Sequence, residues 1–365
     1  MDGPDDPNYQ LFLENYPLLC PNLTSIKFDF FQVQGVQDHK TVSRTLTKAI
    51  CDNSDWRHVN LSPPVDHVVL KHLCMYSTVN TVSLTLAPLT SRPDETCFGP
   101  EDTHFRNVRD LALVLWNSLD FATCLLRPRE QMFHSFKVTL QAASVATKVS
   151  ALLTALASPQ RAHSLRSIDI SHIYYLYAWA RRPTASDKHR EPLSYETFRP
   201  LVPFVHLREL VINLNHPTLL NDEEFASLTR NWPLLEIVRM WWAPGGDPVT
   251  SITLRGLLLL LTSCRKLREI GLTWDAQDVP VGAYEDACSP SITNPIHLHN
   301  SSLQHPDLVA EVFKKHLPSV PGVIPSFTWY LPDHTANNVD FSFNPLECQK
   351  LWWQVNNHIG HPLFV

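Results

Sequence analysis

The chain has 365 residues, a formal net charge of -6 and a hydrophobic content of 44%. This content supports a sizeable core and counts against wholesale disorder, while the lack of a basic excess counts against nucleic acid as the main partner. Glycine is scarce, with 10 residues, and phosphate-binding loops need glycine so that backbone amides can approach the ligand. The composition therefore disfavours a nucleotide-dependent enzyme.

Cysteine usage and hydropathy indicate the compartment. The eight cysteines include no C-x-x-C pair, so we expect neither a zinc site nor a disulfide framework. No apolar signal core follows Met1. The longest aliphatic run, Leu257–Leu261, is far shorter than the roughly 20 residues that cross a bilayer. We therefore expect no membrane partner and a cytoplasmic or nuclear protein with reduced thiols.

A short pattern recurs along the chain after an expected N-terminal cap at residues 1–20. It consists of an apolar residue, two variable residues, an apolar residue, one variable residue and a third apolar residue. Successive copies start about 30 residues apart on average, a period typical of leucine-rich repeats built from a strand and a helix. The strongest copies begin at Leu23, Val79, Val108, Leu165, Leu207, Leu235 and Leu267, and weaker copies begin at Trp56, Phe133, Thr293 and Val320.

Helical signals occupy several of the intervals between these expected strands. Asn221 is a favourable N-cap, Pro306 suits a first helical position, and Gly360 suits the residue after a helix end. The expected helices cover residues 144–158, 222–232, 253–263, 307–316 and 345–359.

Together these elements predict an α/β fold, a single degenerate leucine-rich-repeat-like solenoid over residues 1–365. A strand–helix–strand unit makes a right-handed crossover, so we expect a curved parallel sheet on the concave face and helices on the convex face. About eleven repeats would occupy residues 21–344, with an irregular insertion at 174–192 and a helical C-terminal cap at 345–365. The repeats are degenerate because only one copy carries the ladder asparagine of such repeats, at Asn215.

Four stretches between residues 192 and 318 carry a resemblance to a known family: Leu193–Leu201, Asn231–Leu235, Thr253–Leu257 and His305–Ala310. They resemble the repeat region of fungal F-box proteins with leucine-rich repeats, particularly the expanded families of mushroom-forming fungi. The resemblance implies that the repeats present a surface to a protein target. In that family a separate N-terminal F-box docks to an adaptor of a cullin-type ubiquitin ligase, but here residues 1–15 are too short to hold it. The resemblance therefore implies target binding more directly than ubiquitin transfer.

A search for chemistry yields few candidates. The chain has no G-x-S-x-G elbow, phosphate loop, H-E-x-x-H motif or dinucleotide fingerprint. His297 and His299 share one face of an expected strand at 293–300 and could hold a metal, yet no third ligand stands nearby, so solvent-facing histidines are the favoured interpretation. We therefore expect no catalytic residue, no cofactor, no metal and no enzymatic activity.

A basic stretch offers one alternative. Arg181, Arg182 and the segment Lys188–Arg190 follow the aromatic run Tyr174–Trp179, and basic residues beside aromatics can bind RNA through phosphate contacts and stacking. A solvated insertion loop is the favoured interpretation of residues 174–190.

Alternation along each expected strand predicts a binding surface. The first, fourth and sixth positions of the pattern should face the core, and the third, fifth and seventh should face the concave surface. On that surface the richest neighbourhood, with the Trp and Arg that are enriched in binding hot spots, contains Asp169, Glu209, Arg239, Trp241 and Glu269. The alternative for Trp241 is burial under Trp242 or the next repeat.

We therefore expect a non-catalytic protein-recognition module for an unknown protein target. Three hypotheses follow: the substrate-binding part of an F-box-type ubiquitin ligase receptor, a free-standing repeat scaffold, or an RNA-binding protein that uses residues 174–190.

Overall fold

A computed structural model of the chain gives the fold. It describes residues 15, 22–28, 39–75, 78–86, 107–116, 119–126, 131–141, 144–172, 191–214, 216–242, 251–277, 292, 296–299, 302–326 and 345–360. Over these ranges the protein is a mixed α/β structure in which each assigned strand pair is parallel. The described residues belong to two compact units, the first formed by 1–142 with 158–165 and the second by 143–157 with 166–365. The predicted α/β class with parallel strands is confirmed.

The first unit contains five strands that lie side by side in sequence order. They are β1 (Ser25–Phe28), β2 (His58–Val65), β3 (Thr81–Leu86), β4 (Asp110–Leu115) and β5 (Ser135–Leu140), with helices α2 (His39–Cys51), α3 (His67–Met75), α4 (Leu119–Leu125) and α6 (Pro159–Ser164). One buried ladder crosses the strands in register through Ile26, Val59, Val82, Leu111 and Phe136. This ladder is made by the fourth residue of each predicted pattern copy in this part of the chain.

The second unit continues the same arrangement in strand order β6-β8-β10-β11-β13-β15. These strands are β6 (Ser167–His172), β8 (Glu209–Leu214), β10 (Ile237–Trp242), β11 (Glu269–Leu272), β13 (Ile296–His299) and β15 (Val323–Ser326). Their ladder again uses the fourth residue of each predicted copy: Ile168, Leu210, Val238, Ile270, Ile296 and Val323. All six of these residues are fully buried.

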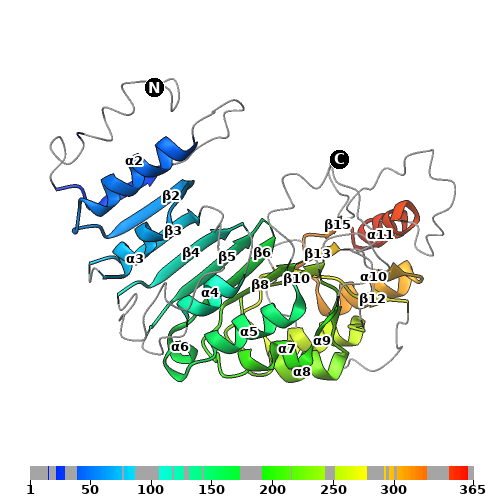
Figure 1. The fold of residues 1–365 in the computed structure, drawn as a ribbon. Coiled ribbons are helices and arrows are strands. Elements are labelled where there is room, and N and C mark those ends of the chain that lie inside the picture. Colours follow the sequence, from blue (N-terminus) through cyan, green and yellow to red (C-terminus); the bar gives the residue numbers. More distant parts are fainter. Residues whose placement is uncertain are drawn as a thin grey trace. The chain divides into compact units, whose positions relative to one another are not determined.

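Helices cover the core side of this second set of strands. They are α5 (Ala146–Leu156), α7 (Tyr195–Phe198) with the short 3-10 helix η5 (Arg199–Leu201), α8 (Asp222–Thr229), α9 (Leu254–Ser263), α10 (Pro306–His316) and α11 (Pro345–Ile359). Helices α5, α7, α8 and α9 line one side of β6, β8 and β10 (Figure 1). Two small parallel pairs, β7 (Leu193–Ser194) with β9 (Thr218–Leu219) and β12 (Asp275–Ala276) with β14 (Ser302–Leu303), complete the unit.

The helix boundaries follow the predicted signals with local differences. Helix α8 ends at Thr229, before the expected residue 232, and the Asn231 side chain bonds back to the Ser227 carbonyl at 2.7 Å just before Pro233. Ser158 does not end the helix that precedes it, because its hydroxyl caps α6 instead. Gly360 follows α11 with a φ of 84°, the left-handed conformation expected after a helix end.

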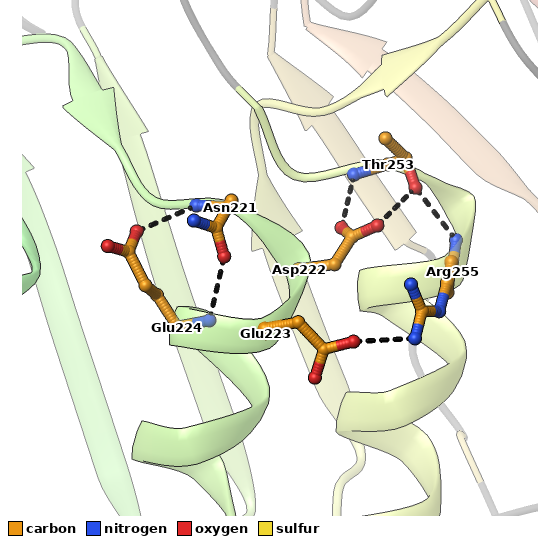
Figure 2. Close-up of polar contacts among 6 residues, drawn as sticks. All are labelled: Asn221, Asp222, Glu223, Glu224, Thr253 and Arg255. Atoms are coloured by element: carbon orange, nitrogen blue, oxygen red, sulfur yellow. Dashed lines mark hydrogen bonds and ion pairs between the residues drawn. The ribbon is translucent and has the colours of Figure 1, made fainter.

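Polar contacts between the starts of α8 and α9 hold neighbouring strand–helix segments together (Figure 2). Asn221 and Glu224 form a reciprocal capping box on α8. The Asp222 carboxylate accepts bonds from the backbone N–H of Thr253, at 2.7 Å, and from its hydroxyl, at 2.6 Å. A Cβ added to Gly256 would overlap Asp222 Oδ1. Glycine at position 256 therefore lets α9 approach this carboxylate.

The C-terminal helix closes the exposed edge of β15. Ile296 donates to the Gly322 carbonyl, so the backbone groups of Val323 point away from β13. The buried side chain of Asn356 in α11 bonds to both of these groups. Its Oδ1 accepts from the Val323 N–H at 2.8 Å, and its Nδ2 donates to the Val323 carbonyl at 2.7 Å. The next residue of β15 whose backbone groups point away from β13 is Pro325, and proline has no backbone N–H that could donate to another strand. This edge is therefore a poor template for an added strand.

Candidate protein-binding face

The side chains opposite the helices in the second unit form rows across the strands. One row, from the fifth pattern position, contains Asp169, Val211, Arg239, Gly271 and His297 in register on β6, β8, β10, β11 and β13. The row before it, from the third position, contains Ser167, Glu209, Ile237 and Glu269. We call Asp169, Glu209, Arg239, Glu269 and His297 the polar patch.

An ion pair between Arg239 and Glu269 lies at the centre of the polar patch. The Arg239 guanidinium donates to Glu269 Oε1, and the side chains are 36% and 10% exposed. Arg239 lies opposite Gly271, two residues beyond Glu269 on the same face of β11. Gly271 places no side chain beside Arg239 on this face, and the guanidinium reaches the Glu269 carboxylate on the neighbouring strand. The pair therefore holds a largely buried negative charge in place.

His297 adjoins this ion pair from the neighbouring strand β13. It lies opposite Gly271 and is half-buried. Burial lowers the pKa of His297, the Glu269 carboxylate raises it in part, and the Arg239 guanidinium lowers it further. The imidazole is therefore neutral near pH 7, because its ordinary pKa is already about 6.5.

The other two carboxylates of the polar patch are held by serine hydroxyls. Ser167 Oγ donates to Glu209 Oε2 at 2.8 Å, and Ser171 Oγ donates to Asp169 Oδ1. A hydroxyl bond leaves a carboxylate its charge and its remaining acceptor positions. Asp169 and Glu209 therefore contribute negative charge to the face on the far side of Arg239 from His297.

The structure places the five predicted site residues as follows. Asp169, Glu209, Arg239 and Glu269 share one sheet face, and Trp241 on β10 lies in register with Asn213 on β8. The Trp241 side chain lies outside the described residues. The face is more closed than alternation alone predicts, because Val211, Asn213 and Glu269 are less than 9% exposed.

Sequence reasoning interpreted His297 as a solvent-facing histidine, with a metal ligand as the alternative, and missed its place beside Arg239 and Glu269. The fifth-position rule, applied to the weak pattern copy at Thr293, gives His297 directly. Its expected companion His299 has a side chain outside the described residues. Among the residues that the structure describes, no group of three His, Cys, Asp or Glu could hold a metal ion.

Two buried titratable groups away from the face have structural contacts. Burial raises the pKa of the Cys264 thiol to about 12, and its Sγ donates to the carbonyls of Thr229 and Trp232. Burial lowers the pKa of Arg161 to about 10, and its guanidinium donates to Gln131 at 3.2 Å. A thiol held protonated is a poor nucleophile, because the thiolate is the reactive form.

No family model matches this sequence, and no curated protein matches it either. In the part of the chain that the structure describes, no helix has the length and apolar character needed to cross a membrane. The basic stretch at 174–190 lies outside the described residues, so the RNA hypothesis remains a prediction.

Proposed function

We propose that this chain is a leucine-rich-repeat-like right-handed solenoid with no catalytic activity, and that the polar patch binds a protein target. The observation that carries the repeat interpretation is the register of the sheet strands. In each unit the fourth residue of each predicted pattern copy aligns with its neighbours, in copies that start about 30 residues apart. Recurrence of one strand position at this period is typical of stacked repeats.

The polar patch supports the target-binding part of the proposal. It contains three carboxylates and one guanidinium beside a neutral imidazole, so its net charge near pH 7 is negative. Glu269 is paired with Arg239, whereas Asp169 and Glu209 each accept a bond from a serine hydroxyl. Charge complementarity then favours a target segment that carries lysine or arginine. Trp241 follows Arg239 by two residues on β10 and would add apolar contact area.

The resemblance to fungal F-box proteins supports the recognition class and suggests how the target would be used. In one version of the proposal the chain is the substrate-binding part of a ubiquitin ligase receptor. In the other it is a free-standing scaffold with no ligase partner. Both versions use the same face, so the identity of co-purifying proteins separates them.

Affinity purification with mass spectrometry tests the proposal. The tagged full chain, the variant Asp169→Asn/Glu209→Gln and the control Glu196→Gln/Glu223→Gln would be purified from the native cells. Each double variant removes two negative charges, and the control carboxylates are 70% and 61% exposed on helices. We expect the target to be at least about fivefold depleted with the patch variant alone, a loss of about 1 kcal/mol in binding.

Equal recovery of every partner with the patch variant and the wild type would contradict the site assignment. Where the patch variant recovers less target, direct titration of the purified target with each purified chain measures the loss of affinity. Recovery of a cullin-type adaptor with the target supports the receptor version, and recovery of the target alone supports the scaffold version.

A further inference from the structure

A second charged feature of the second unit lies where the sheet strands begin. The residue just before each of four neighbouring strands is Arg166, Arg208, Glu236 and Arg268. Backbone hydrogen bonds of 2.7 to 2.8 Å join each of these residues to the next. The N–H groups of Arg208, Glu236 and Arg268 donate to the carbonyls of Arg166, Arg208 and Glu236, respectively. These residues therefore form one row at the amino-terminal end of the strands. We call Arg166, Arg208 and Arg268 the arginine rim.

The arginine rim already holds one carboxylate. Arg208 lies 3.3 Å from Glu236 Oε1, and Arg268 lies 3.6 Å from Glu236 Oε2. The two arginine side chains are 52% and 53% exposed, whereas Glu236 is 26% exposed. A guanidinium has five N–H donors, so both arginines keep donors that face solvent. Among the described residues no carboxylate pairs with Arg166.

Further positive charge adjoins the row. Arg265 and Lys266 are exposed in the turn that leads from α9 to Arg268. The nearest carboxylates along the strands, Glu209 and Glu269, have partners on the sheet face, Ser167 and Arg239. The rim region thus presents five positive side chains against the single carboxylate of Glu236.

We propose that the arginine rim binds an acidic segment of a partner protein through its carboxylates. The proposal does not depend on the polar patch, because the arginine rim consists of different residues and carries the opposite charge. Guanidinium groups bind carboxylates through short charge-assisted bonds, often in a bidentate fork. The Glu236 carboxylate, which lies against Arg208 and Arg268, already makes the kind of contact that a carboxylate of the partner would make.

A protein segment fits this row better than a nucleic acid. A phosphate backbone carries closely and regularly spaced charges. It would have to place phosphates against Glu236, which lies between Arg208 and Arg268 in the row. A protein segment can instead place its carboxylates only where the arginines are.

The spacing of the row defines the segment. Neighbouring strands lie about 4.8 Å apart, so Arg208 and Arg268 begin strands that are about 10 Å apart. An extended chain covers this distance in three residues. Glutamates three residues apart in an extended segment therefore match Arg208 and Arg268, and Arg166 begins the strand next to that of Arg208.

Fluorescence anisotropy with a designed peptide tests this proposal. The probe is a labelled Gly/Ser peptide with four glutamates, one at every third position, and the control probe has glutamine at those positions. We expect the full chain to bind the glutamate probe at about 20 mM salt and to bind it less at about 150 mM, with no binding of the glutamine probe.

Matched variants locate the site. Arg166→Gln/Arg208→Gln/Arg268→Gln should weaken probe binding at least tenfold. Arg199→Gln/Arg230→Gln/Arg255→Gln removes the same charge from exposed arginines outside the row and should change binding less than twofold. Glu236→Gln should strengthen binding about threefold or more because it releases two guanidiniums, and a folding defect cannot produce a gain.

Three results would overturn the proposal. The first is no binding of the glutamate probe by the wild-type chain, and the second is an equal loss in the two triple variants. The third is tighter, rim-dependent binding of single-stranded poly(U) than of the glutamate probe, which would assign the row to nucleic acid.

Discussion

Each unit has a buried ladder at the same pattern position, but the two units differ on the sheet face that lies opposite their core. In the first unit this face is lined largely by small neutral side chains, such as Thr81, Ser83 and Thr85 on β3, and its exposure alternates regularly with buried positions. In the second unit the same pattern positions hold the polar patch, and β8 and β11 are buried at several positions on both faces. The fold therefore depends on the positions that both units share, and the proposed function depends on the positions that differ.

Core truncation should affect both units alike and give the largest loss of stability. Leu111→Ala on β4 and Leu210→Ala on β8 each remove a side chain with at most 1% exposure in an equivalent ladder position. We expect each to lower the free energy of unfolding by about 2 to 5 kcal/mol, measured by urea denaturation. Ser83→Ala on the opposite face is the control and should change it by less than about 0.5 kcal/mol. A loss in one unit alone would contradict the shared ladder.

A contact special to the second unit should give the next largest effect. Gly256→Ala forces a Cβ against the Asp222 carboxylate and should cost about 1 to 3 kcal/mol in the free energy of unfolding. In an Asp222→Ala background the contact with the carboxylate is absent and only a tight contact with Ile252 Cγ2, at 3.0 Å, remains, so the cost of alanine should fall by about 1 kcal/mol or more. A double-mutant cycle measured by thermal denaturation checks this coupling. Additive effects would show that Asp222 is not the obstacle.

The sheet face itself provides a third comparison between the units. Arg239→Ala leaves the largely buried Glu269 without its guanidinium, and we expect a loss of about 1 kcal/mol because Arg239 is itself partly exposed. Lys137 occupies the fifth position of β5 in the first unit and is exposed. Lys137→Ala should change stability by less than about 0.5 kcal/mol. Equal effects in urea denaturation would remove the distinction between the two faces.

The smallest expected effect concerns the pH dependence of the second unit. The folded-state pKa of His297 is below its ordinary value, chiefly through burial. Between these two pKa values the unfolded chain binds more protons than the folded chain, so stability contributed by neutral His297 is present above about pH 6.5 and is lost as the pH falls through the folded-state pKa. His297→Gln should therefore reduce the drop in urea midpoint between about pH 7.5 and about pH 5.5. An unchanged drop would contradict this environment for His297.

The sequence predicts the strands well because their signal is local. One apolar residue at a fixed position in each copy is enough to place Leu210 and Val238 in neighbouring strands, since each must be buried against the same core. The capped start of α8 is likewise specified by Asn221 and Glu224, which are three residues apart. Such short-range patterns specify the local structure without any contact from elsewhere in the chain.

The candidate site is less predictable because it depends on contacts between strands. Nothing in the sequence near Arg239 indicates that its guanidinium pairs with Glu269, 30 residues later, on the neighbouring strand. The near burial of Val211 and Asn213 on the expected solvent face also requires the tertiary structure, because alternation specifies which face a residue has and not how far that face is covered. The same limit applies to the arginine rim, because Arg208 lies 42 residues after Arg166 and 60 residues before Arg268 in the sequence.

Site-specific photo-crosslinking tests the central claim most directly. A photo-reactive phenylalanine analogue would replace Ser171 on the second-unit face, Thr85 on the first-unit face, or Arg230 after α8, in the full chain in its native cells. We predict that the Ser171 position cross-links a single protein target and that the Asp169→Asn/Glu209→Gln variant reduces this product. Cross-linking of the same target from Thr85 or Arg230 to an equal extent, or none from Ser171, would contradict recognition by the polar patch.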